Sequence, residues 1–110
     1  MIWKKKSMKI TYFDYIRTIV PNGSCGTGYS EPDEFEVGYE TENEESFKTI
    51  HIDIWYRPVE SIKNEFITSI KHFFGEVDNI EDAFEMYVEQ ITKNNLCPYT
   101  FEEIMNANNF

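Results

Sequence analysis

The chain has 110 residues, with twenty Asp and Glu against ten Lys and Arg, which gives a formal net charge of −10 at pH 7. This length fits a single domain with one modest core, and a 16% content of Phe, Tyr and Trp argues against a disordered acidic chain. Four of the bases lie near the start, at Lys4, Lys5, Lys6 and Lys9, so the remainder lacks the basic surface that direct binding to nucleic acid or to an anionic membrane requires. The natural complement of such a chain is a basic protein partner.

The first residues lead to expectations about location and domain limits. No apolar run of signal-peptide length follows the basic start, and no run of about 18 apolar residues occurs in the chain. We therefore expect a cytoplasmic protein with Cys25 and Cys97 as free thiols. Residues 1–110 are interpreted as one domain, and Met8 is an alternative natural start that would make residues 1–7 a disordered extension.

The first predicted element, residues 8–20, is ambiguous between strand and helix because it is rich in β-branched and aromatic residues. The spacing of Phe13, Ile16 and Val20 favours a short N-terminal helix. The glycine-rich stretch that follows, residues 22–32, is predicted to be a loop.

Residues 33–56 predict an antiparallel β-hairpin. In its first half, Phe35, Val37 and Tyr39 alternate with polar residues, the period-two pattern of a half-buried strand. The second half also alternates, with one face formed by Ile50, Ile52, Ile54 and Tyr56 and the other by His51, Asp53 and Trp55.

Three helices are predicted after the hairpin, at about residues 58–74, 79–93 and 100–107. Their apolar side chains step by three and four along the sequence, as in amphipathic helices. Pro58 opens the first of them, and Gly75 lies where a C-terminal stop belongs. We therefore expect an α+β domain in which helices cover one face of a small antiparallel sheet.

Glutamates of one parity run along the first hairpin strand, at Glu34, Glu36, Glu40 and Glu42. In a continuous strand, neighbours two residues apart are separated by roughly 6.7 Å, twice the strand rise, which is comparable with the through-space spacing of phosphates along one DNA strand. We interpret the row as a phosphate-like edge, and a solvated outer face is the alternative. Other acids extend the charge, namely Glu44 and Glu45 in the turn and Glu81, Asp82, Glu85 and Glu89 on the second predicted helix.

Other candidate sites are weaker. Trp55 shares a strand face with Asp53 and is either an interface anchor or, if a helix covers that face, part of the core. The loop at residues 22–28 lacks the lysine of a phosphate-binding loop, and Cys25 lacks an activating positive environment. We therefore predict no catalytic residues, no metal site and no cofactor.

The helical half resembles a known family. The segments that carry the resemblance are Glu60-Ser61-Ile62, Phe66-Ile67 with Ser69, Glu81-Asp82-Ala83-Phe84 and Ile91-Thr92. They are similar to the paired C-terminal helices of the small acidic anti-CRISPR proteins that inhibit type II-A Cas9. The resemblance covers about a third of the chain, and it implies acidic residues that occupy the site where Cas9 reads the PAM duplex. The resemblance assigns a binding role to no individual residue of this chain.

These observations lead to one functional hypothesis and two alternatives. We expect a non-enzymatic inhibitor, encoded by a phage or mobile element, that mimics DNA and binds a nucleic-acid-binding nuclease of Cas9-like or restriction type in the cytoplasm of a bacterial host cell. It is expected to bind neither nucleic acid nor membrane directly and to be a monomer or a homodimer. The alternatives are an immunity- or antitoxin-type protein that binds a basic toxin, and a small-ligand-binding protein that uses residues 22–28.

Overall fold

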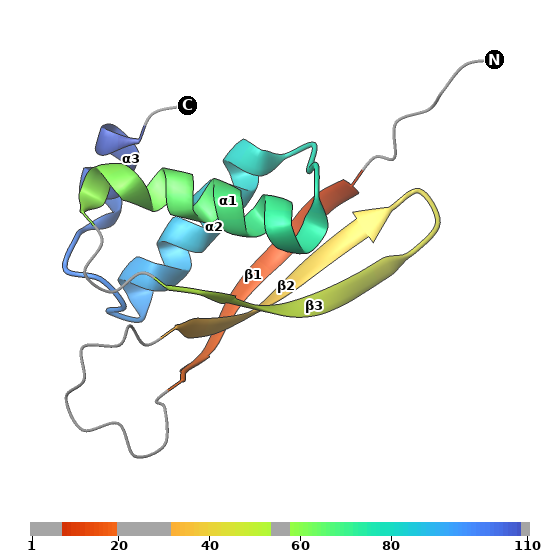
Figure 1. The fold of residues 1–110 in the computed structure, drawn as a ribbon, viewed down its shortest axis with the longest axis horizontal. Coiled ribbons are helices and arrows are strands. Elements are labelled where there is room, and N and C mark those ends of the chain that lie inside the picture. The colour runs from red at the N-terminus through yellow and green to blue at the C-terminus, as the bar shows by residue number, and fades with distance from the viewer. Residues whose placement is uncertain (1–7, 20–31, 54–57, 109–110) are drawn as a thin grey trace.

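The computed structural model describes residues 8–19, 32–53 and 58–108, which form a three-stranded antiparallel sheet and three α-helices (Figure 1). The strands are β1 (Met8–Thr18), β2 (Asp33–Thr41) and β3 (Glu45–Ile52). The helices are α1 (Ile62–Phe74), α2 (Ile80–Lys93) and α3 (Phe101–Ala107), and the short 3-10 helix η1 (Val59–Ser61) precedes α1. The α+β class, the hairpin and the three helices expected from the sequence are confirmed.

Residues 8–18 form a strand, so the short N-terminal helix favoured from the sequence is wrong. The register with β2 shifts at Thr11 and again at Ile16, each an extra residue on β1. The first extra residue places the buried Ile10 and Phe13 three positions apart, which imitates helical spacing. Pairing with β2 and burial against α2 then favour the strand, an effect of tertiary contacts that overrides the local pattern.

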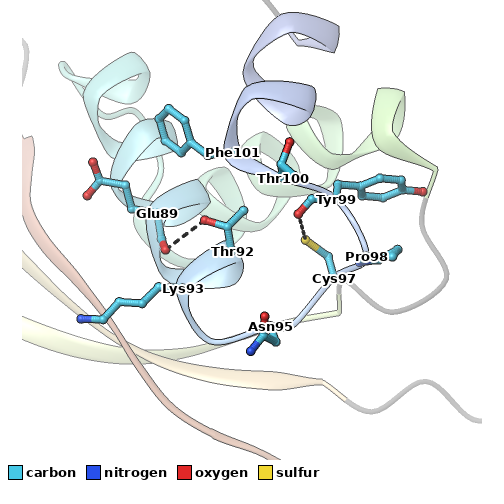
Figure 2. Close-up of a pocket in the computed structure, with 9 residues that line it drawn as sticks. All are labelled: Glu89, Thr92, Lys93, Asn95, Cys97, Pro98, Tyr99, Thr100 and Phe101. Carbon is cyan, nitrogen blue, oxygen red and sulfur yellow. Dashed lines mark hydrogen bonds between the residues drawn. The ribbon is translucent and has the colours of Figure 1, made fainter.

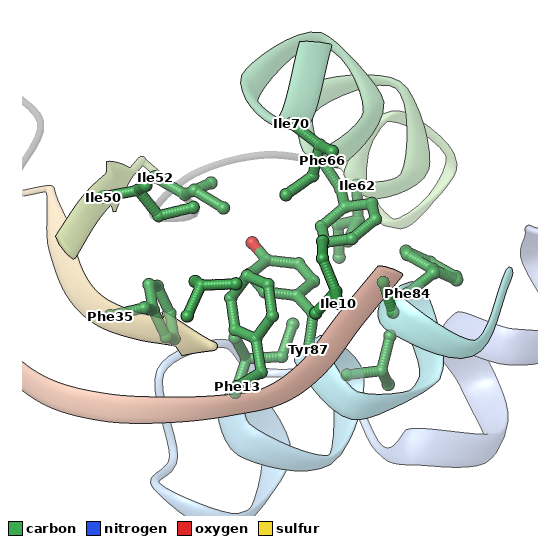
Figure 3. Close-up of a cluster of buried hydrophobic side chains, with 14 of the residues drawn as sticks. Ile10, Phe13, Phe35, Ile50, Ile52, Ile62, Phe66, Ile70, Phe84 and Tyr87 are labelled. Carbon is green, nitrogen blue, oxygen red and sulfur yellow. The ribbon is translucent and has the colours of Figure 1, made fainter. Parts of the chain in front are cut away.

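The core lies between one face of the sheet and the helices (Figure 3). Of the inward residues expected for the hairpin, Phe35, Val37, Ile50 and Ile52 are buried and Tyr39 is partly exposed, whereas Ile54 and Tyr56 lie outside the described residues. Aromatic rings from the two layers meet here: the centroids of Phe66 and Tyr87 are 4.9 Å apart, and Phe13 lies 5.5 Å from Tyr87. Such tilted and edge-to-face pairs stabilise a core beyond the area that they bury.

The helix ends follow local sequence signals. Gly75 ends α1 with a φ of 79°, a conformation that favours glycine, and so confirms the stop expected there. The α3 helix begins with a capping box in which the Glu103 N–H donates to Thr100 Oγ1 at 3.2 Å and the Thr100 N–H donates to Glu103 Oε1 at 3.3 Å.

Side chains of α2 and the residue before it close the outer edge of β1. Asn79 Oδ1 accepts the Ile10 N–H at 2.9 Å, while its Nδ2 donates to the Ile10 carbonyl at 2.8 Å. Further along, Gln90 Oε1 accepts the Tyr15 N–H at 3.0 Å. These bonds satisfy backbone groups that would otherwise be free to pair with another strand.

The other face of the sheet carries no helix of the described chain. Figure 1 shows α1 and α2 gathered on one side of the three strands, with α2 packed mainly on β1 and α1 on β3. None of the described helices is both long enough and apolar enough to cross a membrane. The uncovered sheet face is a regular surface that no described helix occupies.

Candidate functional site

The uncovered sheet face carries most of the predicted glutamate row. Along β2, Phe35 and Val37 are fully buried, whereas Glu34, Glu36 and Glu40 point to the opposite side and are partly exposed. The alternation expected for this strand is confirmed. Because β2 is the central strand of the sheet, the three carboxylates run through the middle of this face.

The remaining hairpin acids lie at the end of the hairpin. Since β2 ends at Thr41, Glu42 belongs to the turn and does not continue the row, which corrects the straight four-residue row expected from the sequence. Glu44 is also in the turn, where its carbonyl accepts the Thr41 N–H at 2.8 Å. Glu45 begins β3 directly opposite Glu40. The acidic surface therefore continues from the sheet face onto the exposed turn of the hairpin.

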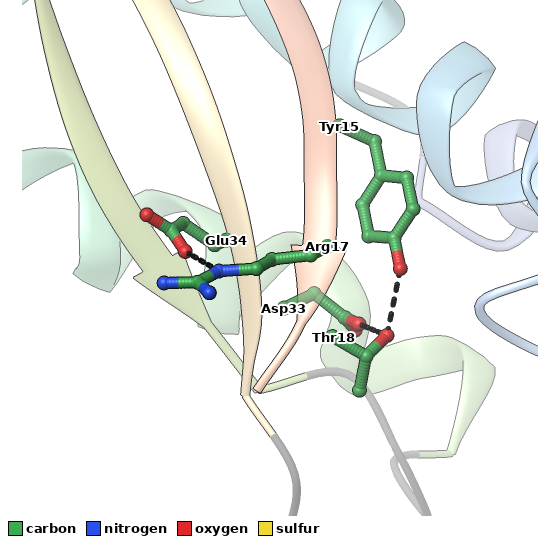
Figure 4. A network of polar contacts seen from close by, with 5 residues as sticks. All are labelled: Tyr15, Arg17, Thr18, Asp33 and Glu34. Carbon is green, nitrogen blue, oxygen red and sulfur yellow. Dashed lines mark hydrogen bonds and ion pairs between the residues drawn. The ribbon is translucent and has the colours of Figure 1, made fainter. Parts of the chain in front are cut away.

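Two carboxylates of the row have partners within the chain. Arg17 Nε lies 2.6 Å from Glu34 Oε2, and Figure 4 shows this pair on the side of the strands away from Tyr15. The Tyr12 hydroxyl donates to Glu36 Oε2 at 2.9 Å. These hydrogen bonds are the main reasons why the pKa values of Arg17 and of the Tyr12 phenol are raised. Both partners were missed from the sequence because their segment was read as a helix.

Two aromatic side chains flank the row at Gly38, where it lacks a carboxylate. A Cβ at Gly38 would lie 2.5 Å from Cε1 of Tyr12, so the tyrosine ring lies against the glycine. On the other side Phe47 pairs with Gly38, and 61% of Phe47 is exposed. Exposed aromatics of this kind are enriched at protein interfaces. The parity that Phe47 shares with His51 on the polar face was a sequence signal that could have identified it.

The strand register places carboxylates directly opposite one another. Asp14 pairs with Glu36, and Glu40 pairs with Glu45. Like charges that face each other across strands destabilise a sheet. Along the described strands, two bases with permanent charge share this face, Lys9 and Arg17. The register places each base opposite a glutamate, Lys9 opposite Glu40 and Arg17 opposite Glu34, so like-charge and opposite-charge pairs occur side by side and the face keeps an excess of carboxylates.

We expect Glu45→Lys to raise the free energy of unfolding by about 0.2–1 kcal/mol, because it replaces a like-charge pair with Glu40 by an opposite-charge pair. Urea denaturation at low salt measures the gain, which should shrink as salt rises. Glu45→Gln is the control: it removes the repulsion without adding an attraction and should give a smaller gain. A loss of stability in Glu45→Lys at low salt would contradict the repulsion.

The acids predicted on the second helix do not join this face. Glu81, Asp82, Glu85 and Glu89 are exposed on α2, whereas the side of α2 that includes Phe84 and Tyr87 is buried in the core against the sheet. These acids therefore belong to the helical side of the domain. The first two lie in the first turn of α2, where the helix dipole favours negative charge.

The remaining predicted positions add little to the surface. Asp53 follows β3 and is half-buried. Trp55, Cys25 and the loop at residues 22–28 lie outside the described residues. Over residues 8–19, 32–53 and 58–108, no three His, Cys, Asp or Glu side chains gather in a way that could hold a metal ion.

An open hollow of about 920 Å³ lies where α2 ends and α3 begins (Figure 2). Glu89 lies on its wall, and so does Cys97, whose Sγ is 3.7 Å from the Tyr99 carbonyl. Burial raises the pKa of the Cys97 thiol. Because a reactive cysteine needs a lowered pKa, this hollow does not support nucleophilic chemistry at Cys97.

Comparison with protein-family models, with curated proteins and with solved structures finds no match to this chain. The geometry and charge of the uncovered sheet face are therefore the main indications of function.

Proposed function

We propose that this protein is a non-enzymatic inhibitor whose uncovered sheet face binds the basic nucleic-acid-binding surface of a defence nuclease, of Cas9-like or restriction type, in place of nucleic acid. The observation that carries the proposal is the row of Glu34, Glu36 and Glu40 on the central strand of a sheet backed by helices. A packed strand holds the carboxylates in place before binding, which reduces the ordering cost of association.

The chemistry of the row suits arginine and lysine. Guanidinium groups bind carboxylates and phosphates with the same bidentate geometry, and a net charge of −10 speeds association with a basic surface. Arg17 partly neutralises Glu34, and Lys9 lies opposite Glu40, so the exposed acids at the hairpin end are the most available part of the acidic surface, namely Glu42, Glu44 and Glu45. The resemblance to anti-CRISPR proteins points to the same class of target.

The test is DNA cleavage by purified type II-A Cas9 with its guide RNA and by a panel of restriction nucleases. Added before DNA, the protein should inhibit at least one of them; added after the enzyme has bound its DNA, it should have little effect. Inhibition should weaken as salt rises, because the attraction is electrostatic. An unrelated acidic protein of equal net charge is the control. Inhibition of no enzyme in the panel, or inhibition that ignores the order of addition, would overturn the proposal.

One observation also favours the immunity- or antitoxin-type alternative. Phe47 is an exposed aromatic anchor on an acidic face, and such a face also suits a basic toxin surface outside the nucleic-acid groove. The two functions differ in whether the inhibited target can still bind nucleic acid. A toxin blocked at such a distant surface would still bind its nucleic acid, whereas a nuclease blocked by mimicry would not.

A further inference from the structure

The two outer edges of the sheet differ. The β1 edge is partly capped, because Asn79 binds the N–H and C=O of Ile10, Gln90 accepts the Tyr15 N–H, and α2 packs along the strand. The strand order leaves β3 as the other edge. An edge strand whose backbone groups are unpaired is a template for another strand, so the state of the β3 edge determines whether a partner can pair there.

The hairpin bonding pattern identifies the outward backbone groups of β3. The Thr41 N–H donates to the Glu44 carbonyl at 2.8 Å, which makes this a hydrogen-bonded pair. Hydrogen-bonded and non-hydrogen-bonded pairs alternate along an antiparallel ladder, and the β2–β3 register has no bulge. The N–H and C=O groups of Phe47, Thr49 and His51 therefore point away from β2.

The same alternation can be checked on the opposite edge. Continued across β2, it places the N–H and C=O groups of Ile10 and Tyr15 on the outer side of β1. Asn79 binds both groups of Ile10, and Gln90 accepts the N–H of Tyr15. The observed bonds thus agree with the assignment.

The outward groups of β3 have no hydrogen-bond partner in the part of the chain that the structure describes. Over Glu45–Ile52 there is no proline and no bulge, two features that usually protect an edge. Lys48, the base of this strand, is turned towards α1, where its Nζ donates to the Phe73 carbonyl at 2.6 Å and lies 5.2 Å from the centroid of the Phe74 ring. Within residues 8–19, 32–53 and 58–108, no hydrogen bond therefore caps the outward backbone groups of this edge.

We infer that the β3 edge is a docking site for an extended, basic segment of the partner protein, which pairs with β3 as a fourth strand. This inference rests on the proposed function, because the basic character of the segment follows from the acidic face beside the edge. Backbone bonds would supply affinity, and alternate side chains would lie beside Phe47 and Thr49 on the uncovered face. Long Lys or Arg side chains there would lie on the same face as the carboxylate of Glu45 on the adjacent strand.

A second copy of the chain is a less favourable occupant. Pairing β3 with itself in one continuous sheet would join two acidic faces, each on a chain with a net charge of −10. Repulsion between like charges opposes such a dimer. The same negative charge attracts a basic segment and repels a second copy of the chain.

Thr49→Pro tests the edge directly. Proline removes the outward N–H of residue 49 and no bond to β2, and edge strands tolerate proline at such positions. The probe is a blocked octapeptide in which lysine and valine alternate, with a glutamate–valine peptide as its control. We expect the lysine peptide to slow amide exchange at Phe47, Thr49 and His51. We also expect Thr49→Pro to lower the affinity about fivefold or more, while Thr49→Ala stays within about twofold.

Each outcome decides between supporting and overturning the inference. A lysine peptide that does not bind, or that binds wild type and a folded Thr49→Pro variant equally, overturns edge pairing. The exchange pattern on the wild-type protein gives a result that depends on no variant, so unfolding of Thr49→Pro does not remove the test. Nuclease inhibition that survives in Thr49→Pro leaves the proposed function intact and rejects the edge. Peptide docking with no nuclease inhibited keeps the edge and rejects the nuclease.

Discussion

Replacing Glu34, Glu36, Glu40 and Glu42 together with glutamine should weaken binding to the inhibited nuclease at least about 100-fold, because each loses a charged contact that an amide does not replace. Glutamine preserves side-chain shape, and at position 36 its carbonyl still accepts the Tyr12 hydroxyl. The fold should therefore survive the change. Dissociation constants from calorimetry, with thermal unfolding as a check on the fold, measure the effect.

The matched control is on α2. Changing Glu81, Glu85 and Glu89 to Gln and Asp82 to Asn removes the same number of charges from exposed positions on the helical side of the domain. Both variants lose the same net charge, so long-range attraction to the nuclease falls equally in both. The sheet variant alone should also lose direct contacts with the nuclease. Equal weakening in the two variants would mean that net charge, and not the face, determines binding. Unchanged binding in the sheet variant would reject mimicry by the three glutamates of β2 and by Glu42 in the turn.

Phe66→Ala should lower the free energy of unfolding by about 3–5 kcal/mol, the cost of removing a large aromatic side chain from a packed core. Phe66 is fully buried, and its ring lies 4.9 Å from Tyr87, 5.4 Å from Phe84 and 5.9 Å from Phe13, measured between centroids. Because small domains are stable by only about 5–15 kcal/mol, this variant should be partly unfolded near its working temperature. Urea denaturation measures the loss.

Phe47→Ala is the control, because it makes the same chemical change at a side chain that is 61% exposed. Its stability should stay within about 0.5 kcal/mol of wild type, while its binding to the nuclease should weaken through the loss of an aromatic contact. The pair of variants thus separates folding from binding. Similar losses of stability in both would show that Phe47 is packed as tightly as Phe66 and is not a surface anchor.

Local patterns were enough to predict the hairpin and the helices. The period of two over residues 33–41 and the steps of three and four in the helices both reflect burial of one side of the element. Gly75 ends α1 through its own backbone conformation, which is also a local effect. The first strand was not predictable in this way. Its bulges at Thr11 and Ile16 break the period of two, and its strand conformation depends on pairing with residues distant in the sequence.

Some features of the candidate site were likewise predictable from local patterns, and others were not. The residue pattern is enough to predict the sign of the surface and the outward parity of Glu34, Glu36 and Glu40, because alternation along one strand is a local property. The tertiary structure alone decided which groups meet across strands: Arg17 with Glu34, and Glu40 with Glu45. It also separates the α2 acids from the sheet face and, among the described residues, leaves the outward backbone groups of β3 without hydrogen-bond partners. Strand register and the placement of helices on one sheet face depend on burying a core that distant segments share. They therefore cannot be predicted from any single segment of the chain.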